Sequence, residues 1–221
     1  MKELKFTTKE IVQVEKYLNK KELYYVDLRY EILDHMLLDI EHQMMDEKIS
    51  FDDAFKNTRN KWGKQLCNSS SFWIGVIFSG PKIFIDKCAK LQKRFFLMNV
   101  VTSLLVMSFM LLFTPVLEME LMRIIFYPMT LFCIGSLLYW GYKMIKTKIK
   151  SSFAYLFYRQ VIPGVFIILL FLLQFINSSV MTLDYSSFYY LVLLFNLFYQ
   201  GFYLFKNHQK EVSQYHKYKR L

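Results

Sequence analysis

The chain has 221 residues, of which 54% are hydrophobic and 19% aromatic, and a composition of this kind excludes an intrinsically disordered protein. Its three cysteines are scattered, which excludes a disulfide-rich scaffold and a CxxC metal motif. The net charge is +10, but the polar N-terminal part, residues 1–67, carries 12 basic and 13 acidic residues. Because this part has no basic excess, we expect no direct nucleic-acid binding.

Three helices are predicted within residues 1–67. Thr7 and Glu10 form a T-x-x-E capping box, after which apolar residues recur at helical spacing. A second helix is expected over residues 27–47, and a third follows a cap formed by Ser50 with Asp53. A bundle this small buries little core, so we expect it to lean on a second copy, on the rest of the chain or on a partner.

Several motifs in this region form a recognisable pattern. They are DLRYEILDH at residues 27–35, IE at residues 40–41, SFDDAF at residues 50–55 and a closing WG at residues 62–63. In these motifs the chain resembles the small helical HAAS-type domain, which precedes membrane spans in many bacterial membrane proteins. The resemblance covers about residues 8–67 and implies a signalling or adaptor module, often associated with PadR-like transcription regulators. That family usually has a glycine before the S-F cap, where this chain has Lys48 and Ile49, so the conformation of the turn stays open.

A polar stripe follows one side of the second predicted helix. At 100° per residue it lies opposite an apolar side, and its members recur every three or four positions: Glu31, His35, Asp39, His42 and Asp46. The pattern fits a solvated face, a protein-contact face or a metal site. A single helix rarely supplies a closed coordination shell, so we predict no metal and no other cofactor. The candidate partner-binding residues are Glu31, His35, Asp39 and His42.

Residues 68–94 are expected to connect the polar part to the apolar part. Asn68 and the three serines after it are typical of a linker. Residues 72–85 are apolar but too short to span a bilayer, and glycine and proline interrupt them, so an interfacial or re-entrant segment is expected. The basic residues that follow are predicted to lie at the membrane surface: Lys87, Lys90, Lys93 and Arg94.

Four long apolar runs fill the rest of the chain, at residues 95–117, 124–142, 161–180 and 188–205. Each lacks a charge in its middle and is long enough to cross a bilayer as a helix; the third has an alternative start at Phe153. We therefore predict an all-α protein, in which a small cytoplasmic three-helix domain is followed by a four-helix transmembrane bundle.

The basic residues between these runs alternate by loop. They precede the first run, separate the second from the third, and fill the tail at residues 206–221. The opposite loops hold Glu118, Glu120 and Arg123 in one case and Asp184 in the other. We therefore predict a multi-pass protein of the inner (cytoplasmic) membrane. By the positive-inside rule, both of its ends lie in the cytoplasm, and the tail is a basic cytoplasmic segment.

No catalytic motif is present, and the polar residues in the runs suit hydrogen bonds between helices: Asn99, Gln174, Asn196 and Gln200. We therefore expect no enzyme. The first hypothesis is a signalling or regulatory membrane protein whose cytoplasmic domain binds a protein partner, with a PadR-like regulator as one candidate. The alternative is a small transporter, or a transporter subunit, for a hydrophobic or lipid-like substrate. A homo-oligomer stays open in either case.

Overall fold

The computed structural model describes residues 6–112, 119–177 and 185–218. It is mostly helical, as predicted, and divides into two compact units. Unit 1 comprises Met1–Gln92 and the short segment Lys150–Ser152, and unit 2 comprises Lys93–Ile149 and Phe153–Leu221. Of the predicted outward loops, Glu118 and Asp184 lie outside the described residues, whereas Glu120 and Arg123 belong to helix α5 (Met119–Lys146) instead of a loop. The last residues of the first and third predicted spans also lie outside the described residues.

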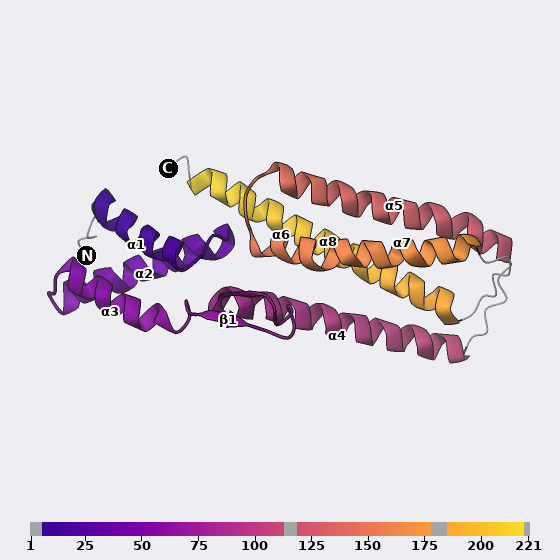
Figure 1. Cartoon of the computed structure of the whole chain (residues 1–221), viewed down its shortest axis with the longest axis horizontal. Coiled ribbons are helices and arrows are strands. Elements are labelled where there is room, and N and C mark those ends of the chain that lie inside the picture. Colours follow the sequence, from indigo (N-terminus) through magenta and orange to yellow (C-terminus); the bar gives the residue numbers. More distant parts are fainter. Residues whose placement is uncertain (1–5, 113–118, 178–184, 219–221) are drawn as a thin grey trace. The chain divides into compact units, whose positions relative to one another are not determined.

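Unit 1 begins with three helices, α1 (Thr8–Lys20), α2 (Val26–Asp46) and α3 (Phe51–Gly63) (Figure 1). The predicted capping box of α1 is present, because Glu10 N donates to Thr7 Oγ1 at 3.4 Å and Thr7 N donates to Glu10 Oε2 at 2.7 Å. Ser50 Oγ likewise accepts from Asp53 N at 3.3 Å at the start of α3. The local start signals read from the sequence are thus confirmed.

A short β-hairpin follows α3 where the sequence predicted a linker, and it is a small addition to a fold that is otherwise helical, as predicted. Strand β1 (Asn68–Ser70) pairs antiparallel with β2 (Ser79–Pro81), with Ser69 opposite Gly80. The serine run resembles a linker in sequence, but Gly75 adopts a φ of 104° that lets the chain turn back on itself. Lys82 N then donates to Cys67 O at 2.8 Å, so the hairpin leads directly into the next helix.

The core of unit 1 extends beyond its three helices. Leu18, Met36 and Ile40 are fully buried at the centre of the bundle. Further along the chain, Leu66, Ile85 and Cys88 are buried as well, and the ring of Tyr25 stacks on that of Phe84 with 3.9 Å between centroids. The small bundle therefore gains its additional apolar contacts from its own chain, and the compact unit runs past residue 67, where the predicted domain ended.

Unit 2 consists of long helices. They are the part of α4 (Lys82–Leu112) from Lys93 onward, α5 (Met119–Lys146), α6 (Ser152–Leu156) from Phe153 onward, the π-helical turn η1 (Phe157–Val161), α7 (Ile162–Asn177) and α8 (Tyr185–Tyr218). The third predicted span corresponds to the succession α6–η1–α7, whose helix starts close to the alternative start at Phe153. Helix α8 continues as far as Tyr218 in the basic tail, which the sequence had separated from the fourth span.

Two glycines allow close packing around η1. A Cβ atom on Gly141 of α5 would lie 3.2 Å from Phe157 Cε1, and one on Gly201 of α8 would overlap the Leu137 Cδ2 methyl group. The Tyr158 hydroxyl donates to Gly141 O at 2.6 Å. Small residues of this kind let helix backbones approach closely, both in soluble proteins and in membranes.

Polar side chains link the helices of unit 2, as predicted for two of the four named residues. Asn196 Nδ2 donates to Thr102 Oγ1 at 2.8 Å, and Gln200 Nε2 donates to Gln160 Oε1 at 2.9 Å. The side chain of Gln174 lies outside those the structure describes. Asn99 differs, since its buried Oδ1 has no hydrogen-bond partner among the described residues.

Within the described residues, one helical stretch is long and apolar enough to cross a membrane, Ser152–Leu173. This finding rests on length and composition alone, criteria that the core helix of a soluble protein can also meet. It agrees with the third predicted span. The first and third predicted spans both run beyond the described residues, and the four-helix transmembrane bundle stays a prediction.

Candidate functional site

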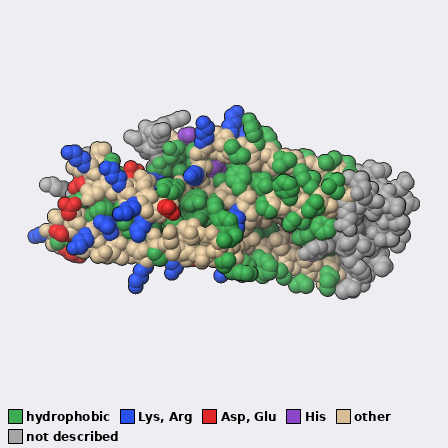
Figure 2. Space-filling model, viewed as in Figure 1, with side chains coloured by type: hydrophobic (Ala, Val, Ile, Leu, Met, Phe, Trp, Pro, Cys, Tyr) green, Lys and Arg blue, Asp and Glu red, His purple; other side chains and the backbone are tan. Residues whose placement is uncertain are grey.

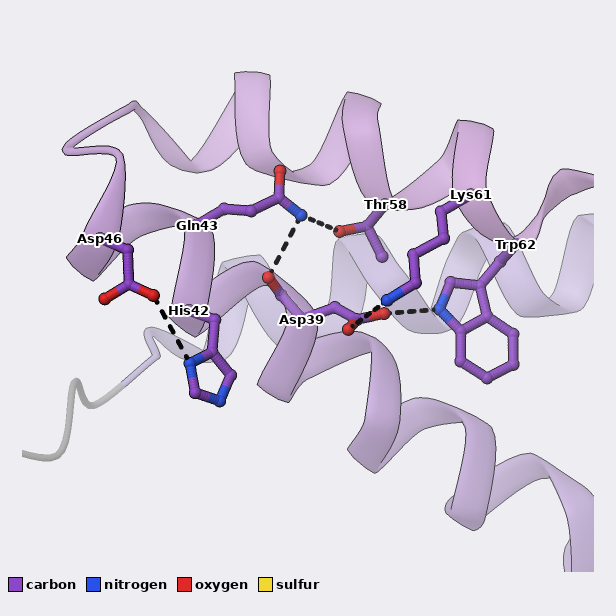
Figure 3. Close-up of polar contacts among 7 residues, drawn as sticks. All are labelled: Asp39, His42, Gln43, Asp46, Thr58, Lys61 and Trp62. Carbon is purple, nitrogen blue, oxygen red and sulfur yellow. Dashed lines mark hydrogen bonds and ion pairs between the residues drawn. The ribbon is translucent and has the colours of Figure 1, made fainter.

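The predicted polar stripe on α2 separates into an exposed part and a part that packs on α3. Glu31, His35 and His42 are exposed to solvent, whereas Asp39 is half-buried. Asp39 accepts hydrogen bonds from Lys61 Nζ at 2.7 Å and from Trp62 Nε1 at 2.9 Å (Figure 3). One of the four candidate partner-binding residues is therefore already engaged within unit 1.

The protonation of Asp39 reflects these contacts. Partial burial by itself would raise the pKa of this carboxyl group, but the hydrogen bonds from Lys61 and Trp62 and the positive charge of Lys61 outweigh burial. The net result is a pKa below its usual value, so the carboxylate is charged at neutral pH. Asp39 thus holds the end of α3 against α2 through a charge-assisted hydrogen bond.

Further contacts fix the relative position of α2 and α3. Gln43 Nε2 donates to Thr58 Oγ1 and to the Asp39 carbonyl oxygen, both at 3.2 Å (Figure 3). The rings of His35 and Trp62 stack with 6.4 Å between their centroids. His42 Nδ1 lies 3.9 Å from Asp46 Oδ2, and both side chains are largely exposed. The remaining exposed residues of α2 are therefore presented from a fixed helix pair.

We define the α2 outer face as Glu31, Asp34, His35, Leu38 and His42, all of which are exposed. Leu38 was not among the predicted site residues, yet 45% of its surface is exposed. Its position could have indicated this, since it follows His35 by three residues and precedes His42 by four. An exposed leucine within a polar, acidic helix face is suited to contact a protein whose surface combines basic and apolar groups.

The described part of the chain contains no group of three His, Cys, Asp or Glu side chains placed to hold a metal ion. Asp39, the middle member of the stripe, is instead hydrogen-bonded to Lys61 and Trp62.

The four predicted membrane-surface residues differ in their surroundings. Lys90, Lys93 and Arg94 are exposed, whereas Lys87 is half-buried. Lys87 Nζ lies 2.7 Å from Asp27 Oδ2, so its charge is directed toward a carboxylate. In unit 2, the Arg94 guanidinium lies over the Tyr203 ring, 5.6 Å from its centroid.

Asp27 is a buried carboxylate that the sequence did not single out. Only 1% of its side chain is exposed, and besides Lys87 it accepts from Ser152 N at 2.8 Å and from the Ser152 hydroxyl. Val26 N also donates to Lys150 O at 2.9 Å. Asp27 thus caps the first N–H group of α6 from a position 125 residues away, a separation that no local motif reveals.

Cys88 lies beside this carboxylate and is fully buried. Burial, and to a lesser degree the charge of Asp27, raise the pKa of its thiol to about 12, although Lys87 acts in the opposite direction. The thiol is therefore neutral under physiological conditions.

No family model, no curated protein and no solved structure matches this chain.

Proposed function

We propose that this chain is an integral membrane protein of signalling or regulatory type, and that its N-terminal helical unit binds a protein partner through the α2 outer face. The protein crosses the inner membrane four times, with both ends in the cytoplasm. The HAAS-like motifs and the alternation of basic residues between the apolar runs support this proposal. A PadR-like regulator is one candidate partner.

The observation that carries membrane residence is the uncovered apolar surface of unit 2. Large hydrophobic side chains are exposed on each of its long helices, including Leu105 on α4, Phe132 on α5, Phe166 on α7 and Phe195 on α8. Figure 2 shows hydrophobic side chains gathered over the long helices and charged side chains over the N-terminal helices. Water-soluble monomers rarely expose apolar surface on this scale, whereas lipid solvates it.

The candidate span Ser152–Leu173 supports the same reading. Only 33% of its most apolar window is buried, although the core helix of a soluble protein would be mostly buried. Phe166 and Leu170 are each 66% exposed on this helix. Lipid is the solvent that such side chains require.

Partner binding is tested by photo-crosslinking in cells. A photoreactive amino acid at Asp34 of the full-length protein should capture one specific partner, and Leu38→Asp in the same chain should abolish that product. The matched control places the probe at Val12, an exposed residue of α1. Equal products from both probes, or capture that survives Leu38→Asp while the protein remains in the membrane fraction, would count against the proposal.

The alternative, a small transporter for a hydrophobic or lipid-like substrate, is favoured by a groove in unit 2 between α4 and α8. Reconstituted vesicles distinguish the two functions. A transporter should accelerate the movement of a fluorescent lipid between leaflets, whereas a signalling protein should leave that rate unchanged.

A further inference from the structure

Helices α4 and α8 of unit 2 are antiparallel neighbours whose contacts change character along their length. At one end, Tyr203 contacts both Arg94 and Phe95, with ring centroids of Phe95 and Tyr203 5.6 Å apart. Seven residues further along α4, Thr102 accepts from Asn196. Beyond that pair the two helices are separated by a groove of about 430 Å³.

The groove is apolar, and its distance from Arg94 along the helix suits a lipid chain. Its walls beyond Thr102 and Asn196 are Leu105, Val106, Leu191, Val192 and Phe195. At about 1.5 Å per residue, Val106 lies roughly 18 Å along the helix from Arg94. Since Arg94 precedes the first predicted span, the groove lies within the hydrocarbon layer, roughly 30 Å thick, if the chain crosses as proposed. Its volume falls in the range of about 300–1,000 Å³ typical of ligand sites.

Asn99, in α4 between Arg94 and Thr102, provides a further polar group. Its Oδ1 is buried, and none of the described residues donates a hydrogen bond to it. A buried acceptor without a hydrogen bond is unfavourable, and a hydroxyl donor that reaches this oxygen would satisfy it. The interface is thus cationic at one end, polar in the middle and apolar at the other.

We infer that this interface binds one anionic glycerophospholipid, with the phosphate at Arg94 and one acyl chain in the groove. An amphiphile of this kind matches the order of the groups along the helices. Guanidinium and phosphate form charge-assisted, bidentate hydrogen bonds, and stacking on Tyr203 holds the guanidinium in place. The inference rests on the proposed membrane residence but not on partner binding.

Native mass spectrometry of the full-length protein in detergent tests the site. We expect one dioleoyl phosphatidylglycerol to bind about tenfold more tightly than dioleoyl phosphatidylcholine. Arg94→Gln should remove this preference. Val106→Trp should weaken both lipids by about tenfold, because the indole fills the groove. Val192→Trp, from the opposite wall, should do the same, and circular dichroism checks that each variant keeps its helix content.

Two matched controls exist in unit 2. Lys143 is a cation over an aromatic ring, Tyr139, at 5.4 Å and away from the groove, so Lys143→Gln should leave the lipid preference intact. Leu170→Trp adds the same bulk at an exposed position of α7. Equal binding of both lipids to the wild-type chain, or wild-type binding by both groove-filling variants, would overturn the inference.

Other occupants give different results, and each of them also overturns it. If glycerol phosphate without acyl chains displaces the lipid as well as phosphatidylglycerol does, the site recognises only the headgroup. If a photoreactive residue at Leu105 crosslinks two chains, a second copy fills the groove. Alkaline carbonate extraction distinguishes a failure of the lipid site from a failure of the proposed function. A chain that alkaline carbonate removes from the membrane would contradict membrane residence itself.

Discussion

Lys48 occupies the turn between α2 and α3 with a φ of 54°, in the left-handed region that glycine adopts without strain. The HAAS-type pattern usually has a glycine in this turn, before the S-F cap, whereas here the left-handed residue of the turn is a lysine. We expect Lys48→Gly to stabilise the turn by about 1 kcal/mol, because a left-handed residue with a Cβ atom is strained. Hydrogen-exchange mass spectrometry of peptides from α2 and α3 measures the effect.

The control for this change is Glu47→Gly. Glu47 has right-handed backbone angles, φ −95° and ψ −7°, so glycine there adds only chain entropy and should destabilise the turn. If hydrogen-exchange protection increased in both variants, or in neither, backbone strain at Lys48 would not be the cause of the effect.

The lowered pKa of Asp39 predicts how the stability of unit 1 changes at acid pH. Its folded-state pKa is depressed, so its contribution is present above the unfolded-state pKa and is lost as the pH falls through the folded-state pKa. Asp39→Asn should cost about 1 kcal/mol at neutral pH and should flatten the loss of stability below about pH 4. The readout is urea unfolding followed by Trp62 fluorescence, with Trp73 and Trp140 replaced by Phe. An unchanged pH profile in Asp39→Asn would assign the acid sensitivity to other carboxylates.

The helices could largely be predicted from the sequence, because their signals are local. The cap at Thr7 and the cap at Ser50 each involve residues three positions apart, and the structure contains both. The hairpin could not be predicted, since the pairing of Ser69 with Gly80 depends on the turn at Gly75. Helices can thus be predicted from residues that are close in the sequence. Strand pairing depends on the conformation of the turn that brings the second strand back beside the first.

The candidate site shows the same limit. Helical spacing placed Glu31, His35 and His42 on one exposed face, but it could not reveal that Asp39 is held by Lys61. Asp27 was missed for the same reason, because its partners Lys87 and Ser152 are 60 and 125 residues away. Contacts between distant segments determine which polar residues remain available to a partner.

Among the elements of unit 2, Gly201 gives the sharpest test of helix packing. Gly201→Ala should destabilise the contact between α5 and α8 by about 1–3 kcal/mol, because Leu137 is fully buried and has little room to move. Gly135→Ala is the matched control on α5, since a Cβ there meets nothing within 4 Å. Thermal unfolding in detergent is followed by the fluorescence of Trp140, which packs against Phe198 and Phe205 of α8. Equal shifts in both variants would contradict close packing at Gly201.

At the scale of the whole molecule, the proposal depends on which side of the bilayer each loop occupies. Residues 1–67 carry a net charge of −1 and the remainder +11, and the basic residues of that remainder concentrate in alternate loops. Short loops rich in Lys and Arg stay in the cytoplasm, so the N-terminal unit, the loop around Lys148 and the tail should share one side. Cys67 provides a native probe, because it is exposed while Cys88 and Cys133 are buried.

A membrane-impermeant maleimide should therefore label Cys67 in inverted vesicles but not in intact cells, in a chain with Cys88 and Cys133 replaced by serine. In a cysteine-free chain, Glu118→Cys should react only from the outside, and Leu221→Cys should behave as Cys67 does. Reporter fusions after Lys150 should agree with those after Leu221. If the fusions after Lys150 and after Leu221 lay on opposite sides, an odd number of spans would separate these two positions. Four spans with alternating basic loops place two spans between them, so this result would contradict the topology.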